Sequence, residues 1–399
     1  MPVSRRKFIQ LGSLASASLM VPQFLRGFEF SPKPLPGNRA LVIIQLSGGN
    51  DGLNTIIPYR NDLYYKSRPQ IGIKKESALA LTDDVGINPS LKFIKQLYDD
   101  GKVSIINGVG YPHPNRSHFR SMDIWQSGSS SDELITSGWI GRYLDGSAKG
   151  KHMHNSMALE VDDTLSLAMK GEERKAIAVG DISQFYSAAS NNYFKTLGSH
   201  AEEHDAQLAG YLYKTLCETT SAADYIYAQS KIYATTQTYP DTQIGKRLKT
   251  VGSLIISNAE TQVYYVSHGS FDTHVNQKNR QDKLFEQLDD SLAALVADLK
   301  KNGRFDDVLI MTFSEFGRRV TQNASNGTDH GTASSMFFIG GGIKKAGIYN
   351  DIPSLDDLDE GDLKYTVDFK QVYATVLDKW LQTDARSVLG KKYSGLDFI

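Results

Sequence analysis

Short apolar runs, each bounded by glycine or polar residues, recur along the chain and predict buried strands. Polar residues do not alternate regularly with apolar ones in these runs, which is typical of parallel strands covered on both faces. The predicted strands are Ala40–Leu46, Val103–Asn107, Gln262–Ser267, Val308–Phe313 and Ser335–Ile339.

Helical spacing of apolar residues appears between and after these strands, in 91–98, 281–300 and 369–381. Strands that alternate with helices predict an α/β fold, an open, mostly parallel sheet with helices on both faces. Residues 151–241 are less regular, and 200–236 are rich in Tyr and Ala with a helical pattern. We therefore expect a partly helical insertion or cap in this region.

The N-terminus has the pattern of an export signal, which we place at residues 1–27. Arg5, Arg6 and Lys7 precede Phe8 and a run to Val21 without acidic residues. Such a run is too short for a stable membrane anchor, and the paired arginines resemble a twin-arginine signal. An ordinary basic tail is the alternative, and both the cleavage site and retention of the segment stay open. A Pro-containing linker, 28–39, then leads into a domain spanning 40–399.

The composition is that of a globular protein, with a net charge of −1. This balance gives no reason to expect nucleic acid or an anionic membrane as a partner. The lone Cys217 cannot form an internal disulfide, and the mature chain shows no further membrane span. The expected partner in export is the twin-arginine translocase, and the expected location is the periplasm or the cell surface.

Candidate chemistry follows from the polar residues next to the predicted strands, because ligands of open α/β sheets bind beyond the carboxyl ends of the strands. Acidic and imidazole side chains gathered at such an edge are ligands for divalent ions such as Zn, Mn or Ca. The candidates, in chain order, are Asn50, Asp51, Arg116, Ser117, His118, Asp272, His274, Glu315, Arg318, Asp329 and His330.

Each of these residues also has a structural interpretation. Asp51 and Ser117 are placed to cap helices, and Asp272 with His274 can hydrogen-bond their own loop. Glu315 directly follows an apolar strand, so its carboxylate needs a cation, either a metal or a neighbouring arginine such as Arg318. Other histidines are discounted, since His152, His154, His200 and His204 have no suitable companions or lie on a highly charged helix face.

Several motifs resemble the family called domain of unknown function 1501, and the resemblance covers nearly the whole chain. They are Gln45–Tyr59, Ser117–Gly128, Phe271–His274 with Gln277, Ser314–Arg318, Asp329–Gly331, Gly340–Lys344 and Val367–Leu377. The family has no established activity. It is similar in fold to the alkaline phosphatase and sulfatase superfamily, so the resemblance implies an alkaline phosphatase-like fold.

The superfamily implies roles residue by residue. Asp51 matches the position that binds one metal, and Ser117, beside His118, matches the nucleophile. Asp272 and His274 match ligands of a second metal, and His330 matches the histidine that joins them.

Two departures put a full two-metal site in doubt. The Asp-x-His spacing of Asp272 and His274 is narrower than usual, and Ser314-Glu315 stands where the superfamily has an Asp-His pair. The resemblance therefore implies one ion, or an altered pair.

The sequence thus predicts an exported metal-dependent hydrolase of phosphate or sulfate esters, acting on a small-molecule or polysaccharide ester. Its expected metal ligands are Asp51, Asp272, His274, Glu315 and His330; its expected catalytic groups are Ser117, His118 and Arg318; and its expected substrate-binding groups are Asn50 and Arg116. Ser117 or a water molecule is the expected attacking group. The alternative is a non-catalytic binding or assembly module that kept the fold but lost part of the metal set.

Overall fold

The computed structural model describes residues 39–147, 157–191 and 207–399. The predicted export signal, residues 28–38 of the linker, and His152, His154, His200 and His204 lie outside the described residues. Among the helices that the structure describes, none has the length and apolar character needed to cross a membrane.

Nine strands form the central sheet, in the order β11-β5-β10-β9-β1-β8-β6-β7, with β14 also paired to β5. The five predicted strands are all present, within one to three residues of their predicted ends. The strands are β1 (Ala40–Leu46), β5 (Val103–Gly110), β6 (Ala158–Glu160), β7 (Ile177–Ala178), β8 (Val263–His268), β9 (Val308–Phe313), β10 (Ser334–Gly340), β11 (Gly347–Ile348) and β14 (Val367–Asp368).

The sheet is mostly parallel, as predicted, but β10 runs antiparallel to both of its neighbours, β5 and β9. The prediction that this strand is parallel was therefore wrong. Residues 314–333 join β9 to the adjacent β10 without a helix, and a parallel neighbour would need a crossover back to the other end of the sheet. Because β10 is antiparallel to β9, the loop that joins them stays at the end of the sheet where the loops that follow β1 and β8 lie.

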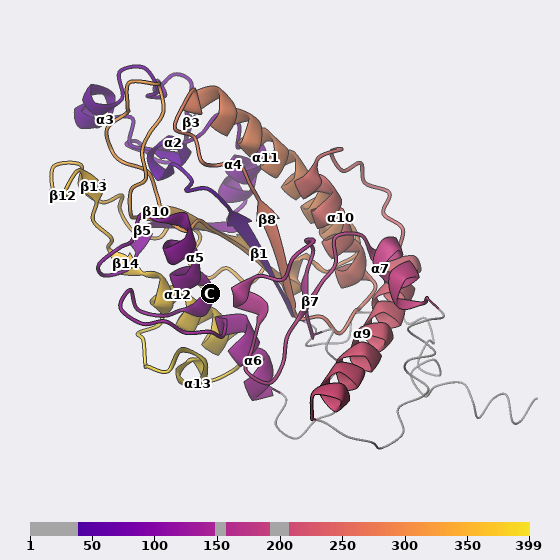
Figure 1. The fold of residues 1–399 in the computed structure, drawn as a ribbon. Coiled ribbons are helices and arrows are strands. Elements are labelled where there is room, and N and C mark those ends of the chain that lie inside the picture. Colours follow the sequence, from indigo (N-terminus) through magenta and orange to yellow (C-terminus); the bar gives the residue numbers. More distant parts are fainter. Residues whose placement is uncertain (1–38, 148–156, 192–206) are drawn as a thin grey trace, which may run out of the picture. The chain divides into compact units, whose positions relative to one another are not determined.

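Helices cover both faces of the sheet (Figure 1). Alternate residues of β1 point to opposite sides: Val42 and Ile44 belong to one apolar core, and Leu41 and Ile43 to the other. The first core is covered by α4 (Lys92–Asp99), α10 (Gln243–Ile256) and α11 (Gln277–Lys301). The second is covered by α5 (His118–Ser127), α6 (Trp139–Ser147), α12 (Phe369–Thr375) with its π-helical continuation Val376–Trp380, and α13 (Ala385–Leu389).

The described part of 151–241 is not a cap set apart from the sheet. It supplies the edge strands β6 and β7, which extend the sheet beyond β8. Its helices α7 (Ile182–Ala189) and α9 (Gln207–Ile232) pack against each other, and α9 also packs against α10. The described part of this region thus contains helices, among them α9, together with two strands of the central sheet.

Short elements carry the loops at the carboxyl end of the sheet, around a small apolar cluster that contains Leu53, Tyr64, Val320 and Leu363. These elements are α2 (Gly52–Thr55), β2 (Ile56–Ile57), α3 (Asp62–Ser67), β3 (Leu79–Ala80), β4 (Gly86–Ile87), β12 (Leu358–Asp359) and β13 (Asp362–Leu363). Two 3₁₀ turns, Leu167–Met169 and Phe305–Asp307, complete the described elements.

Candidate metal centre

The loops that follow β1, β8 and β9 meet at very close range, which two glycines permit. Gly48 and Gly49 have φ values of +119° and +82°. A Cβ on Gly48 would lie 2.3 Å from the backbone nitrogen of Asp272, and one on Gly49 would lie 2.3 Å from the ring of Phe316. Glycine is therefore required in this turn, both for the backbone angles and for the contact between the loops.

Arg318 ties these loops together. Its guanidinium donates to the carbonyl oxygens of Gly49 at 2.7 Å, Thr328 at 2.9 Å and Phe271 at 3.1 Å, and also to that of Gly48. A further bond of 2.6 Å reaches Oδ1 of Asp272. The side chain is buried and its donors are engaged by the protein, so the expectation that Arg318 acts on substrate is replaced by a positioning role.

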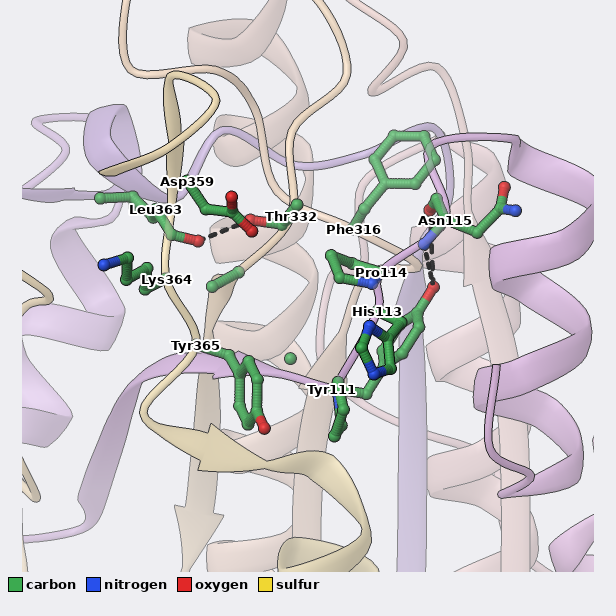
Figure 2. Close-up of a pocket in the computed structure, with 13 residues that line it drawn as sticks. Tyr111, His113, Pro114, Asn115, Phe316, Thr332, Asp359, Leu363, Lys364 and Tyr365 are labelled. Atoms are coloured by element: carbon green, nitrogen blue, oxygen red, sulfur yellow. Dashed lines mark hydrogen bonds between the residues drawn. The ribbon is translucent and has the colours of Figure 1, made fainter. Parts of the chain in front are cut away.

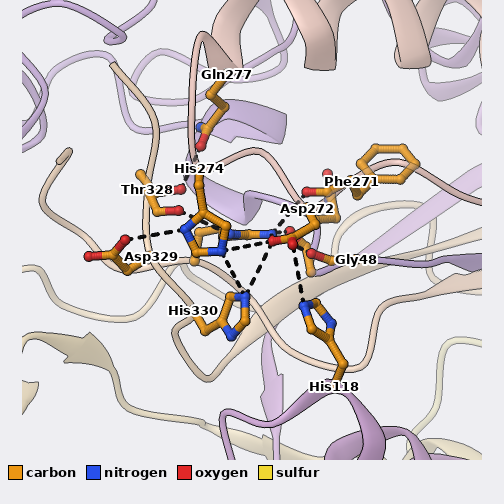
Figure 3. A network of polar contacts seen from close by, with 12 residues as sticks. Gly48, His118, Phe271, Asp272, His274, Gln277, Thr328, Asp329 and His330 are labelled. Atoms are coloured by element: carbon orange, nitrogen blue, oxygen red, sulfur yellow. Dashed lines mark hydrogen bonds and ion pairs between the residues drawn. The ribbon is translucent and has the colours of Figure 1, made fainter. Parts of the chain in front are cut away.

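Four of the predicted residues, His118, Asp272, His274 and His330, lie close together next to Arg318 (Figure 3). His118, Asp272 and His330 each offer one atom, and these atoms lie within 4.8 Å of one another. Nε2 of His274 lies 2.9 Å from Oδ1 of Asp272 and 3.0 Å from Nε2 of His330, and the remaining distance, from His330 Nε2 to Asp272 Oδ1, is 3.3 Å. A tetrahedral Zn²⁺ with bonds of about 2.0–2.1 Å holds its ligand atoms roughly 3.3 Å apart. The spacing therefore fits a divalent ion.

In each of the three imidazoles, Nδ1 contacts an oxygen atom outside the cluster, so Nε2 is the nitrogen that faces Asp272. Nδ1 of His330 lies 2.8 Å from the carbonyl oxygen of Arg116, which can only accept, so this Nδ1 carries a proton. Nδ1 of His118 lies 2.9 Å from Oε1 of Glu315, and Nδ1 of His274 lies 3.3 Å from Oδ1 of Asp329. Neutral rings in these positions present their Nε2 lone pairs to Asp272. The donor set is that of a metal site in which outer carboxylates and carbonyls orient the histidines.

The carboxyl group of Asp272 is held in its ionised form. Partial burial alone would raise its pKa, but the hydrogen bond and charge of Arg318, together with His274 and His330, lower the pKa to about 2. Burial lowers the pKa of His330, which favours its neutral form. An ionised Asp272 beside a neutral His330 is the combination of charge states in which these two side chains can bind a metal ion.

Glu315 does not pair with an arginine, and its carboxylate does not face Asp272. Oε1 accepts from the backbone N–H of Gly48 at 2.8 Å and from Nδ1 of His118, and Oε2 lies 3.3 Å from Oγ of Ser314. The hydrogen bond to Glu315 raises the pKa of His118. The structure thus places Glu315 behind His118, where it orients the ring, rather than among the atoms that face the cluster.

Asp51 and Asn50 lie outside the cluster. Both oxygens of Asp51 accept from the buried Arg68, at 2.5 and 3.0 Å, and Gln277 donates to Oδ2. Asp51 also caps α2 by accepting from the N–H of Leu53 at 3.2 Å. Its carboxylate is neutralised and fully used, which corrects its expected role as a ligand. The amide of Asn50 is buried against Thr55 and Gln281, so it does not face a substrate.

Ser117 occupies the N-cap position of α5, yet its hydroxyl makes no capping hydrogen bond and the residue is exposed. Its two neighbours both contact the cluster: the carbonyl of Arg116 receives His330 Nδ1, and the ring of His118 faces Asp272 with Nε2 3.6 Å from Oδ2. The guanidinium of Arg116 is occupied by Asp362, at 2.5 and 2.7 Å, so this arginine is an ion-pair partner and not a free anion-binding group.

Sequence reasoning did not assign Arg68 or Gln277 a role, although both decide what Asp51 does. Gln277 appeared only as part of a family motif, and nothing in the chain marked Arg68, which follows the short helix α3.

These observations define an α/β protein with a candidate metal centre at the carboxyl edge of its sheet. The chain belongs to the family described as "Protein of unknown function (DUF1501)", whose model matches residues 106–398 and confirms the sequence-based resemblance. No curated protein matches the chain.

The chain is also similar to several solved structures, all at low sequence identity. A phosphonate monoester hydrolase from Silicibacter pomeroyi is 8% identical with a TM-score of 0.39, covering 90% of this chain and 78% of that one. The PsFucS1 sulfatase from Pseudoalteromonas sp. is 12% identical with a TM-score of 0.37, covering 90% and 70%. A protein in the alkaline phosphatase superfamily from Vibrio parahaemolyticus is 10% identical with a TM-score of 0.34, covering 82% and 68%.

Proposed function

We propose that this protein is a metal-dependent hydrolase of phosphate or sulfate esters, and that His118, Asp272, His274 and His330 hold one divalent ion. One observation carries the proposal: the Nε2 atoms of His118, His274 and His330 gather around the carboxylate of Asp272, while each Nδ1 atom lies against an oxygen atom of another group. Nitrogen and carboxylate oxygen atoms this close need a proton or a cation between them, and one divalent ion would satisfy all four groups together.

The residues of the site have two roles, holding the ion and attacking the ester. An ion held by His118, Asp272, His274 and His330 would supply a Lewis acid for the ester oxygens. Ser117 is the candidate attacking group, because its hydroxyl caps nothing and its chain neighbours on both sides touch the cluster. A water molecule is the alternative attacker. In either case the bond from phosphorus or sulfur to the ester oxygen breaks as the new bond forms, and the proton of the attacking hydroxyl or water goes to the leaving oxygen. After attack by Ser117, a water molecule hydrolyses the serine ester, which releases phosphate or sulfate and restores the hydroxyl.

The matched test compares two aspartates in the purified mature protein. Bound Zn, Mn and Ca are measured by elemental analysis, and aryl phosphates, phosphodiesters and sulfates are assayed for turnover. Asp272→Asn is expected to lose both the metal and the turnover. Asp241→Asn is the control, because Asp241 is 90% exposed and pairs only with Lys246. Metal content and turnover that survive Asp272→Asn would contradict the proposal.

A second candidate function is a non-catalytic binding module that retains the ion. The specific observation in its favour is Arg68, which occupies the carboxylate of Asp51 and so removes one expected ligand. A protein that binds one equivalent of metal but turns over none of the ester classes would support this candidate.

We also propose that the protein is exported by the twin-arginine translocase to the periplasm or the cell surface. The proposal rests on Arg5, Arg6 and Phe8 ahead of the apolar run. Replacing both arginines with lysine should leave the protein in the cytoplasmic fraction, whereas unchanged export would refute this route.

A further inference from the structure

A cavity of about 570 Å³ lies beside the loop that carries Phe316 (Figure 2). Phe316 is the shared wall: it lines the cavity, and its ring centroid lies 4.6 Å from that of His330 and 4.9 Å from that of His118. The segments on either side belong to both regions, since Asn115 lines the cavity just before Arg116, and Thr332 lines it just after His330. The cavity and the cluster therefore lie on either side of the Phe316 ring.

Three polar groups that line the cavity are already used by the protein, whereas the imidazole of His113 is an exposed part of the lining. The hydroxyl of Tyr111 pairs with Ser121 at 2.8 Å and accepts from the backbone N–H of Asn115 at 3.1 Å. Thr332 Oγ1 donates to the carbonyl of Leu363 at 2.5 Å. The Oδ1 atom of Asn115 accepts from the backbone N–H of Ser117 at 2.8 Å. These three groups consequently have little left to offer a ligand's hydroxyl groups.

The remaining inner surface is apolar and aromatic. Rings of Tyr111, Phe316 and Tyr365 line it together with Ala333 and Leu363. The charged side chains, Asp359 and Lys364, are exposed, and Lys364 is paired with Asp357. Walls of this kind favour a flat apolar group and disfavour a polyhydroxylated one, whose hydroxyls would be buried without partners.

We propose that this cavity binds the alcohol portion of the substrate and that this portion is an aromatic ring, so that the ester is an aryl ester rather than a sugar ester. The substrate class rests on the proposed hydrolase function, whereas the cavity's preference for an aromatic ring does not. Tyr365 is the key wall, since it is 39% exposed at the mouth and can be changed without opening the core.

The first experiment needs no metal. Saturation-transfer NMR is expected to show benzyl alcohol bound to the protein and myo-inositol not bound. Tyr365→Ala should remove the benzyl alcohol signal, and Tyr365→Phe should retain it, because the ring and not the hydroxyl makes the contact. Leu134→Ala is the control, since Leu134 is 83% exposed and lies outside the cavity. Absence of benzyl alcohol binding, equal binding of inositol, or equal loss in Tyr365→Phe would overturn the inference.

The second experiment joins the cavity to the metal centre, with Zn²⁺ or Mn²⁺ present. Phenylphosphonate should bind about 10- to 100-fold more tightly than methylphosphonate, which is the gain expected from burying one aromatic ring. Tyr365→Ala should reduce only the phenyl affinity. Equal, metal-dependent affinities for the two phosphonates would refute the proposal that the cavity binds an aromatic ring. The hydrolase proposal would not be affected. Failure of both phosphonates and of the metal to bind, with benzyl alcohol still bound, would refute the hydrolase alone.

Discussion

Breaking the ion pair of Asp51 and Arg68 tests whether Asp51 stabilises the fold or binds the metal. Both side chains are about 1% exposed. Asp51→Asn keeps the shape of the side chain and removes its charge. The new amide must place its NH₂ group where Oδ2 accepts from Arg68 and Gln277, or where Oδ1 accepts from Leu53 and Arg68. Either orientation sets donor against donor and leaves Arg68 charged, buried and unpaired.

Breaking a buried ion pair by removing one partner costs about 3–5 kcal/mol. The unfolding entropy of globular proteins is about 2.1 cal/mol/K per residue, so in the unit Gly37–Ile399 such a loss lowers Tm by roughly 4–7 °C. Bound metal should be unchanged, since the Asp51 carboxylate is not among the atoms that face Asp272.

The assay is differential scanning calorimetry paired with elemental analysis, at one protein concentration and one scan rate. Asp272→Asn provides the opposite pattern, because Asp272 is half-exposed and should lose metal with little change in the metal-free Tm. An Asp51→Asn protein with the wild-type Tm but without bound metal would refute this reasoning, and Asp51 would then be a ligand after all.

Three further predictions follow from the same geometry. Glu315→Gln should weaken Zn²⁺ binding about 10- to 100-fold in calorimetric titration, because the charge that orients His118 is lost; unchanged affinity would exclude that role. Ser117→Ala should reduce turnover at least about 100-fold without lowering Tm, since its hydroxyl caps nothing; full activity would leave water as the attacker. Burial raises the pKa of Glu160 from 4.5 to about 7, so the stability it contributes is present below pH 4.5 and falls as pH rises to about 7. Glu160→Gln should gain about 3 kcal/mol over wild type at pH 8, and a Tm difference that does not change with pH would contradict this.

The sequence by itself determined the strands and most of the cluster. Apolar runs such as Ala40–Leu46 and Val308–Phe313 become strands with the predicted ends, because burial on both faces of a sheet imposes that pattern on each segment separately. Asp272, His274 and His330 were expected at one edge because they adjoin these strands, and the structure brings them together.

Only the tertiary structure decided which partner each polar group has. Asp51 and Arg68 are 17 residues apart in the chain, and Glu315 and His118 are 197 apart, so no local pattern links them. The direction of β10 could not be predicted either, because a buried parallel strand and a buried antiparallel strand can have the same apolar sequence pattern. Strand formation depends on the burial of a segment, whereas the role of a charge depends on which opposite charge or donor lies within about 3 Å of it.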